Sequence, residues 1–320
     1  MSEFAATRFS AIGTYVDVAS TLGAPIDELA AFAREEIGVL DKVASCFRSD
    51  SEVRTLFRST RVQRPARQEY EVSSELFELL SFALWAAEIT GGLVDPTIGG
   101  ALARLKLYPV DADPTRAVLR RADLVPGYRS ITLDSSKRTA VLPRGVLLDF
   151  HSIAKGLWAD RIARRLFERF RLDVLVGLGG DVGIAAPHGT SFPIAVPLSG
   201  SSEYAAGDPV IALDRGGIAT SSTRWRTFDV EILGEEGKGL THIVDPSTAY
   251  PVHSSVESVS VVAPSAGVAN VFSLATIVGG DRGLGLLEES GYAARVTTKH
   301  GDVSYFSSWS RELSPVGGVR

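Results

Sequence analysis

A histidine and an aspartate lie three positions apart in the segment Thr241-His242-Ile243-Val244-Asp245-Pro246, at the predicted end of a strand. An imidazole can accept a proton near neutral pH, and a nearby carboxylate can orient the ring or join it in binding a metal. The segment therefore predicts a general base or a metal ligand at His242, with Asp245 beside it. A purely structural histidine is the alternative interpretation.

Two further segments are suited to binding phosphate. Residues 149–156, Asp-Phe-His-Ser-Ile-Ala-Lys-Gly, are predicted to open a helix, where unpaired N–H groups favour anions and Lys155 adds a full positive charge. Gly179-Gly180-Asp181 follows a short apolar strand, and paired glycines let free N–H groups approach an anion. Neither segment fits a Walker A loop or a Rossmann fingerprint, so a capped helix and an ordinary turn are the alternatives.

Clustered hydroxyl groups form the last chemical feature. The run Ala219-Thr220-Ser221-Ser222 follows Gly216-Gly217 and offers three hydroxyls for hydrogen bonds to a polar ligand. Serine clusters are also common in turns that bind nothing. The run is therefore a weak signal by itself.

Hydrophobic periodicity predicts the elements that position these segments. Helical spacing covers residues 27–47 with Asp27 as N-cap, a second helix that begins after Ser73 or Ser74 and stops at Gly91-Gly92, a third that follows Asp149, and a last helix over residues 268–278. Strands are predicted at residues 15–19, 174–178, 194–198, 210–213, 259–263, 294–297 and 303–306, with 131–133 and 140–142 as a hairpin. This order predicts a mixed α/β (α+β) fold. The loop-rich residues 200–208 are its weakest point and the candidate boundary between two lobes.

The bulk composition narrows the class of protein. The chain has 320 residues, a net charge of −5, and 45% hydrophobic residues, so a sizeable core is expected and nucleic acid is not an expected partner. The one cysteine, Cys46, excludes an internal disulfide and is predicted to be a buried structural thiol. No segment is apolar enough to span a bilayer, and the first residues do not read as a leader, so a cytoplasmic protein without a membrane partner is expected.

The order of these motifs resembles the FAD:protein FMN transferase (ApbE) family across nearly the whole chain. Residues 45–56 resemble the family as well. The motifs that carry the resemblance are, in order, Gly13-Thr14, Val94-Asp95-Pro96-Thr97-Ile98-Gly99, residues 149–156, Gly179-Gly180-Asp181, Ala219-Thr220-Ser221 and His242-Ile243-Val244-Asp245-Pro246.

The resemblance implies a fold and a reaction. It implies one domain over residues 1–320, with two interleaved α/β lobes around a flavin-nucleotide cleft. Family members bind FAD with Mg²⁺, transfer FMN to a threonine of a target flavoprotein through a phosphoester, and release AMP. His242 and Asp245 would be the catalytic residues, and the carbonyl of Ser152 would face the metal. The nucleotide would be bound by Lys155, Gly179, Gly180, Asp181, Thr220, Ser221 and Thr97.

One helix departs from the family pattern. The resemblance implies an aspartate and, four residues later, a threonine, which share one helical face and converge on the metal. Here Asn270 and Leu274 stand at these positions. An amide oxygen is a poorer ligand for Mg²⁺ than a carboxylate, and leucine offers no ligand atom, so a weakened or lost metal site is predicted. Thr241 and Ala249 depart too, where the family often has a second histidine and a glycine.

These departures leave three functional hypotheses. The first is an FMN transferase whose metal is held by Asp181, Asp245, Asn270 and the substrate phosphates. The second is a flavin-binding protein without transferase activity. The third is an enzyme that accepts a different substrate in the same cleft.

Overall fold

The computed structural model describes residues 4–62, 66–108, 124–197, 208–225, 227–232 and 235–309. The contacts divide the chain into two compact units, each assembled from segments that are distant in the sequence. Unit 1 comprises Met1–Val39, Ile153–Trp225 and Ser254–Arg320, and unit 2 comprises Leu40–Ser152 and Arg226–His253. The mixed α/β class and the interleaving of the two units agree with the prediction. The predicted weak point at residues 200–208 lies outside the described residues except for its last position.

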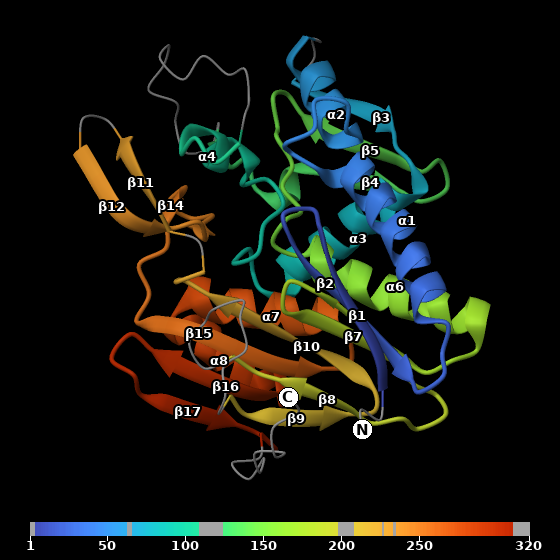
Figure 1. Cartoon of the computed structure of the whole chain (residues 1–320). Helices are drawn as coiled ribbons and strands as arrows, with labels where there is room; N and C mark the ends of the chain where they lie inside the picture. The colour runs from blue at the N-terminus through green and yellow to red at the C-terminus, as the bar shows by residue number, and fades with distance from the viewer. Residues whose placement is uncertain are drawn as a thin grey trace. The chain divides into compact units, whose positions relative to one another are not determined.

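Unit 1 is built on an eight-stranded sheet in which every pair of neighbouring strands is antiparallel. Its strand order is β1-β2-β6-β7-β10-β15-β16-β17 (Figure 1). The strands are β1 (Phe4–Ala11), β2 (Thr14–Thr21), β6 (Val174–Leu178), β7 (Asp181–Ala185), β10 (Gly216–Ser222), β15 (Val256–Ala263), β16 (Ala293–Thr298) and β17 (Val303–Phe306).

Helices cover one face of this sheet. α6 (Ala154–Phe170) packs on β6 and β7, and α7 (Ala266–Gly279) packs on β10 and β15. α8 (Asp281–Ser290) follows α7 and packs against it. α1 (Ile26–Ala44) is joined to α6 by a hydrogen bond of 3.1 Å from the indole N–H of Trp158 to the carbonyl of Glu36. These contacts leave the helix-facing side of the central strands buried.

A two-stranded hairpin covers the opposite face. β8 (Phe192–Ala195) pairs with β9 (Val210–Leu213), and their inward side chains join those of the sheet in one hydrophobic cluster. The buried members of that cluster are Leu175, Val182, Ala186, Phe192, Ile194, Val196, Ile211, Ile218 and Trp309. Because both faces are covered, all five residues of β6 are buried, which is why this strand reads as a continuous apolar run.

Unit 2 contains a three-stranded sheet and several short elements. The sheet has the order β3-β5-β4, with β4 and β5 forming the predicted hairpin. The remaining elements are α2 (Glu52–Val62), β3 (Arg67–Glu71), α3 (Ser74–Ile89), α4 (Gly99–Arg104), a 3₁₀ turn (Tyr128–Ser130), β4 (Thr132–Asp134), β5 (Thr139–Pro143), β11 (Thr227–Ile232), β12 (Glu235–Thr241), β13 (Val244–Asp245) and β14 (Tyr250–Pro251). β11 pairs with β12, and β13 pairs with β14.

Several element predictions need correction. The predicted strand that ends near His242 is β12. The elements that were not predicted are β1, β3, β7, β10, β11, β13, β14, α2 and α4. α7 is followed by α8, so the predicted helix over 268–278 is not the last helix. α1 begins at Ile26, which places Asp27 inside its first turn rather than at the N-cap. Cys46 is fully buried as predicted but lies beyond the end of α1. By contrast, Ser73 caps α3 by accepting a hydrogen bond from the N–H of Leu76. No described helix has the length and apolarity needed to cross a membrane.

The turn between β6 and β7 consists of two glycines, and its geometry requires them. Gly179 and Gly180 have φ angles of 62° and 103°, the left-handed region that suits a two-residue hairpin. A Cβ atom on Gly179 would lie 2.3 Å from the Oγ1 of Thr14. The turn therefore excludes any side chain at Gly179 on two independent grounds.

Gly179→Ala is expected to lower the free energy of unfolding by about 2–4 kcal/mol, because left-handed strain adds to the overlap with Thr14. Gly189→Ala is the matched control, since Gly189 has a φ of 86° with nothing within 4 Å of an added Cβ. The Gly189→Ala variant carries the left-handed strain without any overlap, and it should lower the free energy of unfolding by about 1 kcal/mol. Denaturant unfolding of both variants checks this. Equal losses would show that the overlap is relieved without cost.

A buried carboxylate anchors the start of α7. The N–H groups of Ala266 and Gly267 each donate to Asp160 at 2.9 Å. Burial raises the pKa of Asp160 to about 6, although these hydrogen bonds oppose the shift. Because the pKa of Asp160 is higher in the folded chain than in the unfolded chain, its protonated form favours folding. This contribution to the free energy of unfolding is complete below about pH 3.8 and is lost as the pH rises to about 6.

The difference in unfolding free energy between the native chain and Asp160→Asn is therefore expected to depend on pH. The native chain should lose roughly 2–3 kcal/mol relative to the variant between pH 4 and pH 6, because the amide does not titrate. Urea unfolding at several pH values measures this difference. A difference that stays constant across the interval would contradict the assignment to Asp160.

Candidate functional site

Three of the predicted site residues meet at the start of β7 in unit 1. Asp181 is 2% exposed, and its Oδ2 lies 3.8 Å from the ammonium nitrogen of Lys155. The amide nitrogen of Asn270 lies 3.3 Å from both carboxylate oxygens of Asp181. Burial raises the pKa of Asp181 above its ordinary value, while Lys155 and Asn270 oppose the shift. The result is a buried carboxylate with a half-exposed lysine beside it.

Asn270 also presents a buried acceptor that no described residue pairs with. The residue is 4% exposed, and its Oδ1 accepts no hydrogen bond from the described residues. A buried acceptor left unpaired is costly, so this atom marks a place for a donor or a cation.

The residues on α7 do not reproduce the Mg²⁺ ligands that the sequence resemblance implies. Asn270 directs its nitrogen, rather than its oxygen, at Asp181. Leu274, which is half-buried, contributes no ligand atom. Lys155 already places a positive charge beside Asp181. This set does not fit a hard, charged oxygen cage of the kind that Mg²⁺ prefers.

The two predicted hydroxyl residues of β10 lie on opposite faces of the sheet. Ser221 faces α7, where its Oγ lies 2.8 Å from the Oγ of Ser273. Thr220 faces the other way and pairs with Ser260 at 2.8 Å. Because successive strand residues alternate between faces, the two hydroxyls cannot meet one ligand group together.

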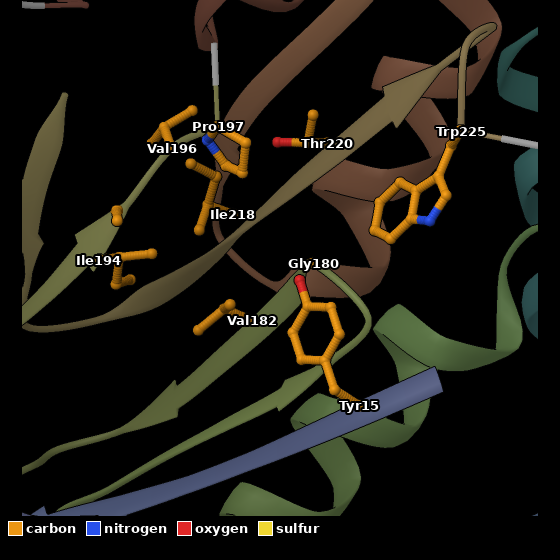
Figure 2. A pocket seen from close by; sticks show the side chains of 10 residues that line it. Tyr15, Gly180, Val182, Ile194, Val196, Pro197, Ile218, Thr220 and Trp225 are labelled. Carbon is orange, nitrogen blue, oxygen red and sulfur yellow. The ribbon is translucent and has the colours of Figure 1, made fainter. Parts of the chain in front are cut away.

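Thr220 lines a pocket on the face of the sheet opposite to α7. Figure 2 shows the side chains of Tyr15 and Trp225 lying beside Gly180 in this pocket. The remaining lining residues are Val182, Ile194, Ala195, Val196, Pro197 and Ile218. Two aromatic rings and an apolar wall favour a flat ring system, and Thr220 adds a hydrogen-bonding group.

The glycine turn is only partly available to a ligand. The N–H of Gly179 donates to the carbonyl of Tyr15 at 3.0 Å, so the prediction of free N–H groups is wrong at this position. Gly180 lies in the pocket wall, where an added Cβ would come within 3.3 Å of the ring of Trp225. Its missing side chain therefore keeps the pocket open.

His242 and Asp245 lie in unit 2, at the connection between β12 and β13. Both are half-buried. The carboxylate of Asp245 accepts from the N–H of Ser247 at 2.7 Å, and its carbonyl accepts from the N–H of Ala249 at 2.8 Å. Ala249 has a φ of 62°, a left-handed conformation that favours glycine, so the alanine at this position carries backbone strain that a glycine would avoid.

Two other predicted residues lie in unit 2. Thr97 is fully buried, donates to Asp95 at 2.7 Å and accepts from the N–H of Gly127 at 3.0 Å. This position does not support a direct contact of Thr97 with the nucleotide, because its hydroxyl is already engaged in holding a loop. Ser152 lies in the turn before α6, and its role as a carbonyl ligand stays a prediction.

Sequence reasoning missed Tyr15, Trp225 and Asp160. Tyr15 reads as a strand residue and Trp225 as a loop residue, and only the fold places both beside Gly180. Asp160 does carry a signal, since it sits among apolar positions of α6 five residues after Lys155. A carboxylate that falls on the buried side of a helix indicates a specific partner.

Comparison with known proteins matches residues 12–296 to the ApbE family. A FAD:protein FMN transferase from Haemophilus influenzae is 29% identical over 282 residues, covering 84% of this chain and 79% of the relative. A FAD:protein FMN transferase from Treponema pallidum is 28% identical over 251 residues, covering 68% and 64%.

Solved structures show the same fold. The ApbE protein of Thermotoga maritima superposes with a TM-score of 0.77 at 26% identity, covering 95% of this chain and 97% of the other. The apo form of the flavinyl transferase ApbE from Pseudomonas stutzeri gives a TM-score of 0.76 at 23% identity, covering 98% of each chain. These similarities extend over both units.

Proposed function

The chain belongs to the ApbE family, and from this premise we propose that it is an FAD:protein FMN transferase. The observation that carries the proposal is the family match over residues 12–296, together with relatives of that name that align with most of the chain. FAD is then the substrate, and a flavoprotein with an acceptor threonine is the target. The products are AMP and a target that carries FMN in a phosphoester bond.

The reaction is a phosphoryl transfer with a simple balance of atoms. The threonine oxygen forms a bond to the phosphorus of the FMN half, and the bond from that phosphorus to the bridging oxygen breaks. AMP leaves with the bridging oxygen, and the hydroxyl proton passes to a base. Such a reaction requires that the phosphates be held in line and that their negative charge be neutralised.

The residues of unit 1 are suited to holding the nucleotide. Lys155 supplies a positive charge for phosphate oxygens, and Asp181 holds the ammonium group in place at 3.8 Å. The two aromatic rings that border the pocket beside Gly180 are of the kind that stack on a flat ring such as that of a flavin.

His242 is proposed as the group that accepts the proton of the threonine hydroxyl, with Asp245 in support. This assignment rests on the match of His242-Ile243-Val244-Asp245-Pro246 to the family motif. An imidazole suits the task because its ordinary pKa lies near neutral pH. No step is assigned to Mg²⁺, because the residues of α7 do not fit the ligand set.

An end-point assay tests the proposal. The purified chain is incubated with FAD and a target flavoprotein, AMP is measured by chromatography, and flavin fluorescence is followed on the denatured target. AMP and labelled target should both appear, and neither should appear with a target whose acceptor threonine is replaced by valine. Bound FAD without any AMP would overturn the transferase assignment in favour of a flavin-binding protein.

A further inference from the structure

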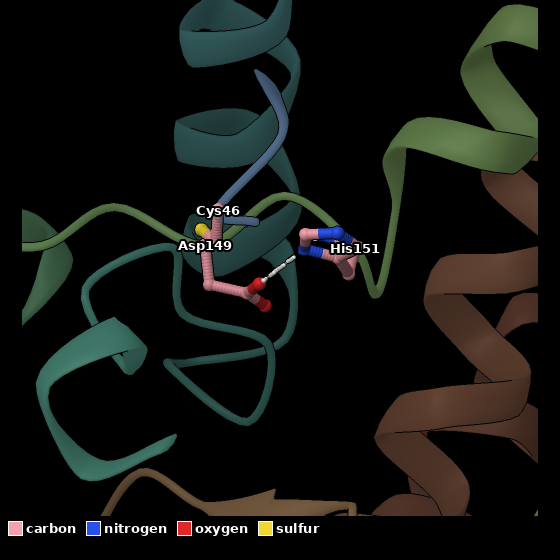
Figure 3. A group of neighbouring side chains, drawn as sticks. All are labelled: Cys46, Asp149 and His151. Atoms are coloured by element: carbon pink, nitrogen blue, oxygen red, sulfur yellow. Dashed lines mark hydrogen bonds and ion pairs between the residues drawn. The ribbon is translucent and has the colours of Figure 1, made fainter. Parts of the chain in front are cut away.

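Three side chains of the types that bind transition metals gather in unit 2. One candidate ligand atom from each of Cys46, Asp149 and His151 lies within 4.8 Å of the other two. Figure 3 shows the three side chains as neighbours, with the His151 ring directed at the Asp149 carboxylate. Cys46 follows the end of α1, whereas Asp149 and His151 lie on the loop that precedes α6. The proposed flavin transfer uses none of these side chains.

The carboxylate of Asp149 is buried and accepts several hydrogen bonds. Asp149 is 2% exposed, and its Oδ1 accepts from the hydroxyl of Tyr108, from the backbone N–H of His151 at 3.3 Å, and from the Nδ1 of that ring at 3.0 Å. Burying a carboxylate is costly unless it is paired, and a cation beside Asp149 would lower that cost.

The thiol of Cys46 completes the group. It is fully buried and lies 3.4 Å from the carbonyl oxygen of Leu148. Burial and the nearby Asp149 raise the pKa of this thiol, whereas the buried guanidinium of Arg54 lowers it. A bound transition metal ion replaces the thiol proton, so the neutral thiol of the metal-free protein is compatible with a thiolate ligand in the bound form.

We propose that Cys46, Asp149 and His151 form a site for a divalent transition metal ion of the zinc class. Thiolate, imidazole and carboxylate are the ligands that zinc takes in proteins, and this mixture disfavours Mg²⁺ and Ca²⁺. The two anionic ligands balance the charge of the ion. The side chain of His151 is 41% exposed, which provides a path from solvent and room for a fourth ligand.

Aromatic side chains pack around His151 and would hold its ring in place. Phe47 packs edge-on against both His151 and Tyr108, with ring centroids 5.5 Å and 5.4 Å away. The hydroxyl of Tyr108 lies 3.1 Å from the Nδ1 of His151, so it can orient the ring as an outer partner. A bound ion would join the end of α1 to the loop before α6 and would stabilise unit 2.

Cobalt binding tests the site without any reference to flavin transfer. Co²⁺ is titrated into chelator-treated protein, and the near-ultraviolet band of thiolate-to-cobalt charge transfer is recorded. Cys46 is the only cysteine of the chain, so no other residue can give this band. We expect a band that saturates at one ion per chain, is abolished by competing Zn²⁺, and is accompanied by a zinc-dependent rise in the melting temperature.

Variants decide whether the three residues act together. His151→Gln and Asp149→Asn should each weaken Co²⁺ binding by more than about tenfold. His188→Gln is the matched control, because His188 forms a similar pair with Asp173, at 2.9 Å, in a different part of the chain; this variant should bind as the native chain does. No thiolate band with excess Co²⁺, or a band unchanged by His151→Gln, would overturn the proposal. Loss of AMP release alone would not bear on it.

Discussion

Replacing His242 by alanine is expected to lower the rate of AMP release from FAD by about 100- to 10,000-fold while FAD still binds. Removal of a positioned general base forfeits catalysis of this size, because the hydroxyl must then lose its proton to water. His242 is half-buried at the connection between β12 and β13, so its loss should leave the core of unit 2 intact. The initial rate at saturating FAD and target measures the effect.

His253→Ala is the matched control for this prediction. His253 is exposed and lies in the same unit, yet it belongs to none of the motifs that the reaction uses. Its replacement should change the rate less than twofold, which is roughly the scatter expected of a neutral surface substitution. A His242→Ala protein that retains the rate of the control would show that the proton goes elsewhere.

Replacing Asn270 by aspartate is expected to lower the free energy of unfolding by roughly 2–4 kcal/mol at neutral pH in the presence of chelator. The new carboxylate would stand where an amide now donates to Asp181 at 3.3 Å, so two buried negative charges would meet. Like charges at this separation raise the pKa of one carboxyl. The loss should therefore diminish as the pH falls and that group takes up a proton.

The same variant should gain a response to Mg²⁺, because a cation relieves the repulsion and finds the charged oxygen that α7 now lacks. Leu274→Thr alone is the control, since it adds a hydroxyl on the same helical face without adding charge. Urea unfolding with chelator and with Mg²⁺ measures both variants. An Asn270→Asp protein as stable as the native chain in chelator, and indifferent to Mg²⁺, would contradict the account of this site.

The elements that the sequence predicted well are those with local signals. β6 was predicted with its observed bounds because the apolar run Val-Leu-Val-Gly-Leu is followed directly by the Gly179-Gly180 turn. α3 was predicted from the Ser73 cap and the paired glycines after its end. In both cases the same residues that form the element also mark its limits.

The strands that were missed depend on distant partners. β10 reads as a turn because it begins with two glycines and ends in hydroxyl residues. However, a Cβ on Gly217 would lie 2.3 Å from the backbone nitrogen of Ala266, so close packing of α7 on the strand requires glycine. β7 opens with the buried carboxylate of Asp181, a poor strand residue whose burial depends on Lys155 and Asn270.

The arrangement of the candidate site could not be predicted from the sequence for the same reason. The family motif singled out Lys155, Asp181 and Asn270 separately, and only the fold of unit 1 brings them within hydrogen-bonding and ion-pair distance. The motif suggested Asn270 as a weak metal ligand, whereas the structure makes it a donor to Asp181. No spacing in the sequence predicts the direction of one amide group.

Intact-mass spectrometry of the target protein after reaction tests the central claim most directly. The native chain is incubated with FAD and target, AMP is quantified in the same sample, and the target is weighed after denaturation. FMN transfer predicts one FMN residue added to each modified target, with one AMP released for each addition. A target of unchanged mass, with FAD recovered whole from the protein, would contradict it.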